Sequence, residues 1–354
     1  MDRSADASPG YRAYDEDLAG EFLKTVKLSQ CQGAITVIKI IKEIILAVGY
    51  SSGDLAFFSL KDDFKFLCKQ REHTGSITAM ESADLTFVSG GSPVNKEVLL
   101  TGGNERDKKI VMWDISTFQP AKVLKGHDHM VTSIVDIHDG RTLATGSMDS
   151  KIAFWNVGDE EPECIQVLDD TNFPIIVMEY DMDDGILSAG TLDGQICLWQ
   201  VYMENGLYVG CSLIKVLSLE AHVLDILRSS CLPHSIITLE SDFSIREYDL
   251  GTGKLIKTVK ADKPLVDVFV VEANGGKTAI VFAIDNANNL HRIPDWAECP
   301  PRLVLPSTPD AEVNIKRYVG YNHKSQIYIR SNELLLLTCD QSNQSITVNK
   351  LNIL

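Results

Sequence analysis

A repeated pattern constrains the possible folds of this chain more than any other feature. Its clearest copy is residues 126–156, GHDHMVTSIVDIHDGRTLATGSMDSKIAFWN, where Gly-His leads through an apolar run and two turns to Phe-Trp. Related segments end at Trp113, Trp199 and Tyr248, so the spacing is 42 residues before Trp155 and then 44 and 49 residues. A regular spacing of this size is the signature of a repeat architecture.

Each copy of the pattern is typical of a small antiparallel sheet. The runs LATGS and KIAFW are short, rich in strand-forming residues and separated by turn residues. One such sheet cannot bury both of its faces alone, so it must stack on neighbours. The pattern resembles the WD40 repeat, named after the Trp-Asp dipeptide seen here at Trp113-Asp114. That resemblance implies a β-propeller, in which four-stranded blades surround a central channel.

We therefore expect an all-β, seven-bladed WD40-type propeller closed by an N-terminal strand. Residues 22–28 alternate like a strand and are the expected closing strand, because a closed ring leaves no long free sheet edge. Residues 1–20 are polar and acidic and are expected to be a disordered tail before a single domain at 21–354. Six blades followed by a divergent C-terminal segment is the structural alternative. The expected blade cores are 33–60, 73–116, 127–158, 171–202, 222–250, 262–295 and 313–354.

The resemblance also implies a hydrogen-bonded tetrad of His, Ser or Thr, Asp and Trp within a blade. Such a group would satisfy four polar side chains at one place, so its His and Asp are expected to be structural and not catalytic. Blade three has the complete set, and blade four keeps only the Asp and the Trp. The residues concerned are His73, Thr101, Asp107 and Trp113 in blade two; His127, Thr145, Asp149 and Trp155 in blade three; Asp193 and Trp199 in blade four; and His222, Thr238, Asp242 and Tyr248 in blade five.

Partner contacts are expected on the narrow top face of the ring, where the family often binds other proteins. The spacing of the repeat places several apolar residues at nominally exposed positions there, and an exposed apolar patch indicates a protein contact. The alternative is that some of these side chains line the channel. The expected partner-binding residues are Arg106 in blade two; Met130, Thr132 and Met148 in blade three; and Pro174, Ile176 and Leu192 in blade four.

Composition narrows the range of functions. The 354 residues carry a formal net charge of −16, which argues against direct nucleic-acid binding because that needs a basic surface. No apolar run approaches 18 residues, so no membrane span is expected. Eight cysteines are scattered without a C-x-x-C pair, which favours a reduced, intracellular setting in the cytoplasm or the nucleus.

No catalytic or cofactor motif is complete in the chain, and no metal site is expected. Gly276-Lys277-Thr278 matches the end of a phosphate-binding loop, but Val271 stands where its first glycine is required. We therefore expect a non-catalytic scaffold that binds other proteins or peptides, as a monomeric propeller within a larger assembly. The alternatives are a ubiquitin-ligase substrate receptor, although the Trp-Asp-x-Arg motif is missing after Trp113, and a hydrolase that uses channel-facing residues.

Overall fold

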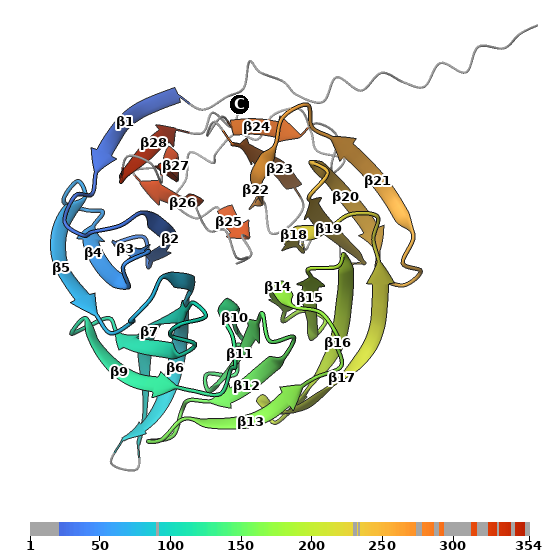
Figure 1. Ribbon diagram of the computed structural model, residues 1–354, viewed down its shortest axis with the longest axis horizontal. Helices are drawn as coiled ribbons and strands as arrows, with labels where there is room; N and C mark the ends of the chain where they lie inside the picture. Colours follow the sequence, from blue (N-terminus) through green and yellow to red (C-terminus); the bar gives the residue numbers. More distant parts are fainter. Residues whose placement is uncertain are drawn as a thin grey trace, which may run out of the picture.

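Seven four-stranded sheets are arranged in a ring around a central channel (Figure 1). This computed structural model describes residues 21–89, 92–228, 232, 234–273, 278–286, 290–293, 313–316, 325–330, 333–340 and 344–350. The expected all-β, seven-bladed propeller is confirmed, whereas the expected tail at 1–20 lies outside the described residues. Within the described part of the chain, no helix has the length and apolarity needed to cross a membrane.

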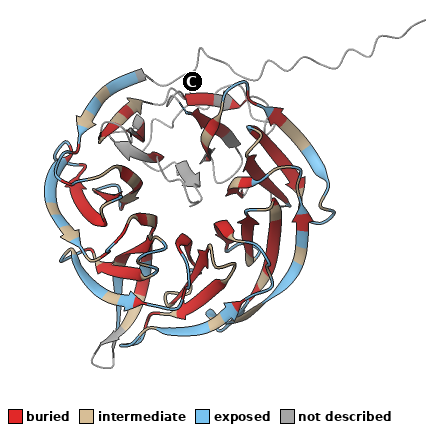
Figure 2. Ribbon diagram, viewed as in Figure 1, coloured by how far each residue is buried: buried red, intermediate tan, exposed pale blue. Residues whose placement is uncertain are grey.

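Blades one to five share a single topology, in which four consecutive strands pair in chain order from the channel to the rim (Figure 1). The innermost strands are buried and the outermost are largely exposed (Figure 2). Their bounds are β2 Ile35–Ile41, β3 Ile45–Tyr50, β4 Asp54–Ser59 and β5 Lys65–Arg71 in blade one; β6 Ile77–Ser89, β7 Ser92–Gly103, β8 Ile110–Asp114 and β9 Gln119–Leu124 in blade two; β10 Val131–Asp136, β11 Thr142–Ser147, β12 Ile152–Asn156 and β13 Glu163–Leu168 in blade three; β14 Ile175–Asp181, β15 Ile186–Thr191, β16 Gln195–Glu204 and β17 Leu207–Ser218 in blade four; and β18 Val223–Leu227, β19 Ser235–Glu240, β20 Ser244–Asp249 and β21 Leu255–Lys260 in blade five.

The glycine that recurs in the second strand of a blade has a packing role. A Cβ atom on Gly146 of β11 would lie only 2.7 Å from Ile175 Cγ2 on the inner strand of the next blade. A Cβ atom on Gly190 of β15 would likewise lie 2.6 Å from Val223 Cγ1. The absence of a side chain therefore lets the β-branched residue of one inner strand pack against the preceding sheet, and this contact repeats from blade to blade.

The two ends of the chain share blade seven. Strand β1 (Glu21–Lys27) pairs antiparallel with β28 (Ser345–Lys350), which continues into β27 (Glu333–Asp340) and β26 (Ser325–Arg330). Apolar side chains of β27 and β28 are buried together with those of blade one, including Leu335 and Ile346 against Ile38 and Val48. The expected closure by an N-terminal strand is thus confirmed, and burial of apolar surface at this junction stabilises the ring.

Blade six departs from this topology. It contains β22 (Leu265–Ala273), β23 (Thr278–Asp285), β24 (Leu290–Ile293) and β25 (Val313–Lys316), in the order β24-β23-β22-β25. Strand β25 pairs with the end of β22, so it lies on the channel side of the sheet (Figure 1). The expectation that the seventh core begins at residue 313 is therefore wrong for residues 313–316. The long inner strand β22 offers unpaired backbone groups at its edge, and β25 satisfies them.

Candidate functional site

The four tetrad residues of blade three come together at the side of the sheet. His127 Nδ1 lies 2.9 Å from Asp149 Oδ2, and His127 Nε2 lies 2.8 Å from Thr145 Oγ1. The indole N–H of Trp155 donates to the same hydroxyl oxygen over 2.8 Å. The backbone N–H of Asp128 donates to the Asp149 carboxylate over 2.9 Å. Strands β11 and β12, the turn between them and the loop that precedes β10 are thereby tied together.

The electrostatics of this group point to a structural role. Burial alone would raise the pKa of Asp149, but the hydrogen bond and the charge of His127, with backbone N–H donors, lower it to about 2. The carboxylate therefore stays ionised at neutral pH, bonded to His127 and to the backbone N–H groups of Asp128 and Lys151. Both ring nitrogens of His127 are engaged within the tetrad, and the side chains of His127 and Asp149 are only 2% and 5% exposed, so a substrate has little access to either group.

Blade two contains the same arrangement. His73 contacts Asp107 through Nδ1 and lies 2.7 Å from Thr101 through Nε2, and Trp113 Nε1 donates to Thr101 over 2.8 Å. Burial would raise the pKa of Asp107, but His73 and the donors of Thr74 lower it to about 2. All four residues that the sequence placed in this tetrad are thus brought together.

In blade four the indole N–H of Trp199 has a different hydrogen-bond partner from the one expected from the sequence. Ala189 carries no hydroxyl, and Trp199 Nε1 instead donates to Asp170 Oδ2 over 3.1 Å. Asp193 accepts a hydrogen bond from Thr191 within its own turn. Sequence analysis missed Asp170. The available signal was an acidic residue in the segment before β14, close to the place where other blades carry their histidine.

Blade five also differs, because His222 is exposed and does not enter the polar group; its backbone N–H donates to Ser241 Oγ over 3.2 Å. Fully buried Glu240 takes its place, accepting hydrogen bonds from Thr238 (2.8 Å) and Tyr248 (3.0 Å).

Arg246 completes the blade-five group. It forms an ion pair with Glu240, and its Nη2 donates to Asp242 Oδ2 over 2.7 Å. Sequence analysis missed both Glu240 and Arg246. The available signal was their spacing: Thr238 and Glu240 on one strand, and Arg246 and Tyr248 on the next, are two residues apart and so share one face of the sheet.

Blade six has a polar pair to which no role was assigned from the sequence. Buried His291 lies 3.1 Å from the carboxylate of buried Asp285. In the part of the chain that the structure describes, no group of three or more His, Cys, Asp or Glu side chains is placed to hold a metal ion.

The top face is where the turn between the second and third strands meets the loop before the first strand. Met148 donates its backbone N–H to Met130 O over 3.0 Å, and Leu192 donates to Pro174 O over 2.9 Å. Leu192 has 44% of its surface exposed, and Met148 and Pro174 are half-buried. Phe173, which sequence analysis missed although it precedes Pro174, is 38% exposed.

Three of the expected contact residues belong to the packed interior instead. Thr132 is buried and donates to Gly146 O (3.1 Å) and Ile175 O (2.8 Å), so its hydroxyl joins two blades. Met130 is 9% exposed and Ile176 is 8% exposed, which leaves little of either side chain for a partner. Arg106 is exposed on blade two. The apolar top-face patch is therefore smaller than expected and consists of Met148, Phe173, Pro174 and Leu192.

Comparison with known proteins supports the fold assignment. Residues 118–156 match the family model described as "WD domain, G-beta repeat". One segment of the chain is thus similar to a WD40 repeat, and the structure as a whole is a seven-bladed β-propeller. Over 75% of its length, and 72% of the other chain, the structure is similar to the computationally designed Ika8 protein, with a TM-score of 0.54 and 17% sequence identity.

Three curated proteins illustrate the sequence relatives. The chain is 28% identical over 101 residues to Cross-pathway control WD-repeat protein 2 of Flammulina velutipes, covering 27% of this chain and 29% of that protein. It is 28% identical over 131 residues to WD repeat and SOCS box-containing protein 1 of Danio rerio, covering 36% and 27%. It is 34% identical over 96 residues to Pre-mRNA-processing factor 19 of Mus musculus, covering 27% and 17%. Each match thus spans less than a third of the relative.

Proposed function

We propose that this propeller is a non-catalytic protein-interaction scaffold, a subunit of a multiprotein complex that binds other proteins through its top-face patch. The exposure of Leu192 and Phe173 beside half-buried Met148 and Pro174 carries the proposal. Apolar side chains that remain in water on a rigid, polar-rimmed surface are typical of a protein contact, and Met adapts readily to different partners.

Two further observations support a scaffold over an enzyme. The His–Asp pairs of blades two and three hold their own blades together, and every side-chain hydrogen-bonding atom of His73 and His127 has a partner within its tetrad. The six cysteines among the described residues are free thiols, which fits the proposed cytoplasmic or nuclear setting.

The proposal is tested with the double variant Met148→Glu/Leu192→Glu. Two carboxylates in the top-face patch would have to be desolvated by any partner that covers it, so partner capture from a lysate should be lost. The melting temperature should not change, because neither side chain is buried in the core.

The matched control is Leu255→Glu/Ile256→Glu on the outer strand β21, where both side chains are about half exposed. This variant adds the same charge and should retain the partners, which quantitative mass spectrometry of the captured proteins will show. Equal retention of partners by both variants would contradict the role of the top-face patch.

A further inference from the structure

Two unusually long hairpins flank blade three on its outer side. The β6–β7 hairpin of blade two has strands of 13 and 12 residues, and β16 and β17 of blade four have 10 and 12 residues. Both hairpins contact the turn between β10 and β11. Thr86 N–H donates to Gly140 O over 2.7 Å, and Tyr208 N–H donates to Asp139 Oδ2 over 3.1 Å. The extensions are thereby held against blade three.

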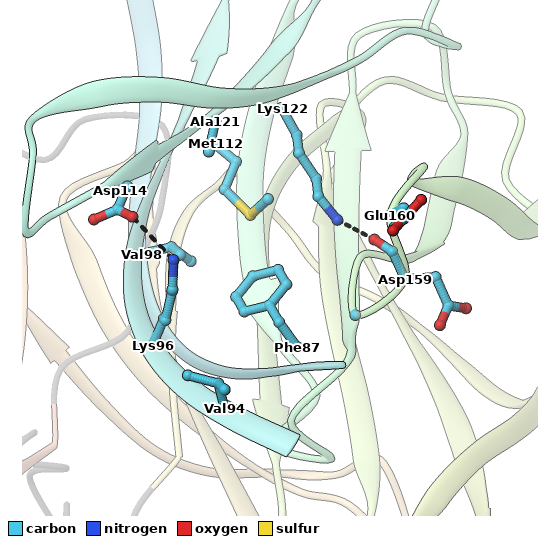
Figure 3. A pocket seen from close by; sticks show the side chains of 11 residues that line it. Phe87, Val94, Lys96, Val98, Met112, Asp114, Ala121, Lys122, Asp159 and Glu160 are labelled. Atoms are coloured by element: carbon cyan, nitrogen blue, oxygen red, sulfur yellow. Dashed lines mark hydrogen bonds and ion pairs between the residues drawn. The ribbon is translucent and has the colours of Figure 1, made fainter. Parts of the chain in front are cut away.

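A cavity of about 370 Å³ lies between the β6–β7 hairpin and residues 158–160 of blade three (Figure 3). Its centre is apolar, with Phe87, Val94 and Met112 along the wall, and Val94 is 40% exposed. On one side Lys96 pairs with Asp114 over 3.3 Å. On the other side the Lys122 ammonium lies 5.1 Å from the centre of the Phe87 ring and donates to the carbonyl oxygen of Asp159. The cavity is therefore a preformed apolar recess with polar ends.

A second cavity of about 310 Å³ lies on the other side of blade three, where the β16–β17 hairpin meets β13. Its lining combines three exposed apolar side chains, Ile165 (40% exposed), Leu207 (42%) and Val209 (56%), with polar residues that include Asp139 and Arg141. The aromatic ring of Tyr208 stacks on Phe154 at 4.7 Å, and its hydroxyl bonds to Gln166, which fixes the hairpin in place.

An acidic loop runs between the two cavities. Residues 159–163 read Asp-Glu-Glu-Pro-Glu, and the four carboxylate residues are exposed. Asp159 and Glu160 border the first cavity, and β13 carries the chain from Glu163 to Ile165 at the second. No described Lys or Arg side chain forms an ion pair with any of these four carboxylates. The Lys122 ammonium interacts electrostatically with Asp159 and Glu160, but the four carboxylates outnumber this cation. The loop therefore presents net negative charge between the two cavities.

We propose that this rim of blade three docks a basic segment of a partner protein in which apolar residues alternate with Lys or Arg. The apolar side chains would enter the two cavities, and the cations would pair with the loop at 159–163. Charge complementarity selects this occupant, because a second copy of a chain with net charge −16 or an acidic segment would be repelled by the loop. This outer-rim site is separate from the top-face patch.

Fluorescence anisotropy with a labelled basic-apolar peptide, in which Lys and Arg alternate with Leu and Val, tests the proposal. Two companion peptides replace either the apolar residues with Ser or the basic residues with Glu. The wild-type propeller should bind the basic-apolar peptide at least about tenfold more tightly than either companion, because the site requires both kinds of contact. Equal binding of the basic-apolar and the Ser peptide, or no binding of the former, would overturn the proposal.

Matched charge variants separate the site from the bulk charge of the protein. Glu160→Gln/Glu161→Gln/Glu163→Gln should weaken binding of the basic-apolar peptide about tenfold at low salt. The control Glu43→Gln/Glu105→Gln/Glu220→Gln removes the same charge from exposed positions on blades one, two and five and should leave the Kd within about twofold. An equal loss in both triple variants would show attraction by net charge alone and would reject the site.

Substitutions in the two cavities test whether the apolar side chains of the peptide bind there. Val94→Ser/Leu207→Ser replaces an exposed apolar side chain of each cavity with a small uncharged polar one, and neither side chain is part of the buried core. Binding of the basic-apolar peptide should fall, whereas binding of the Ser peptide should stay unchanged. Unchanged binding of the basic-apolar peptide would mean that the cavities do not take apolar side chains.

Discussion

Blades three and five solve the same structural problem with different residues. In blade three the hydroxyl of Thr145 links His127 and Trp155, and His127 in turn contacts Asp149. In blade five Thr238 occupies the matching strand, but its hydroxyl meets Glu240, which is held by Arg246 and Tyr248. What the fold requires at this place is that buried polar groups satisfy one another, and more than one set of side chains meets that requirement.

The two groups differ in how they depend on charge. In blade three the acidic partner is favoured in its ionised form, and the pKa of Asp149 falls to about 2 against the effect of burial. In blade five burial raises the pKa of Glu240, although Thr238 and Arg246 oppose the rise. Blade five therefore depends more on a buried cation than blade three does, and the following predictions test that difference.

The largest effect is expected for Arg246→Met. This change leaves the fully buried carboxylate of Glu240 without its cation, and breaking a buried pair in this way costs about 3–5 kcal/mol. Urea unfolding followed by tryptophan fluorescence should show this loss in the free energy of unfolding. Arg106→Met, at an exposed site, is the control and should change it by less than about 0.5 kcal/mol. A similar small change in both variants would mean that Glu240 is not held by charge.

The next effect is expected for Thr145→Val in blade three. The variant leaves His127 Nε2 and Trp155 Nε1 without their shared partner, at a cost of about 2–3 kcal/mol. Thr238→Val in blade five should cost only about 1 kcal/mol, because Glu240 keeps Arg246 and Tyr248. Chemical denaturation of both variants gives the comparison, and an equal loss would contradict the distinction between the two groups.

Lowering the pH should reduce the free energy of unfolding, because Asp149 in blade three becomes protonated. Its pKa is depressed in the folded protein, so its stabilising contribution is present above the unfolded pKa near 3.8 and is lost as the pH falls towards about 2. The contribution is about 2 kcal/mol. Wild-type stability should therefore decline over this interval, and Asp149→Asn should decline less steeply. Parallel curves for the two proteins would show that Asp149 does not titrate as described.

The smallest effect is expected in blade four. Asp170→Ala removes the acceptor of the Trp199 indole N–H, and a buried donor without a partner costs about 1 kcal/mol. Asp169→Ala alters the exposed neighbouring residue and serves as the control. Thermal unfolding should separate the two variants by a few degrees, and identical melting temperatures would mean that water replaces Asp170 without loss.

Sequence analysis could predict the ring and two of its polar groups because those features are local. The spacing of His127, Thr145, Asp149 and Trp155 follows a known repeat, and residues 22–28 alternate as a closing strand must. The blade-five group was not predictable from the same pattern, since Glu240 and Arg246 meet only through the pairing of β19 with β20. Strand β25 was misplaced because it pairs with residues about 40 positions earlier in the chain, which no local pattern reveals.

The exposure of the top face was only partly predictable for the same reason. The repeat spacing placed Met130, Thr132 and Ile176 at the surface, but all three are buried, and the Thr132 hydroxyl donates to Ile175 O of the next blade. Leu192 remained exposed as expected. Burial depends on how adjacent sheets approach, and that distance is set by contacts such as Gly146 against Ile175.

The most direct test of the account is site-specific photo-crosslinking from the top face in cells. A benzophenone amino acid replaces Leu192 in one version of the protein and Ile256, on the outer strand of blade five, in the other; both positions are exposed. The account predicts discrete protein adducts from position 192 and none from position 256. Adducts from position 256 alone, or none from position 192 while the protein stays folded, would contradict the proposal that this propeller binds its partners through the top face.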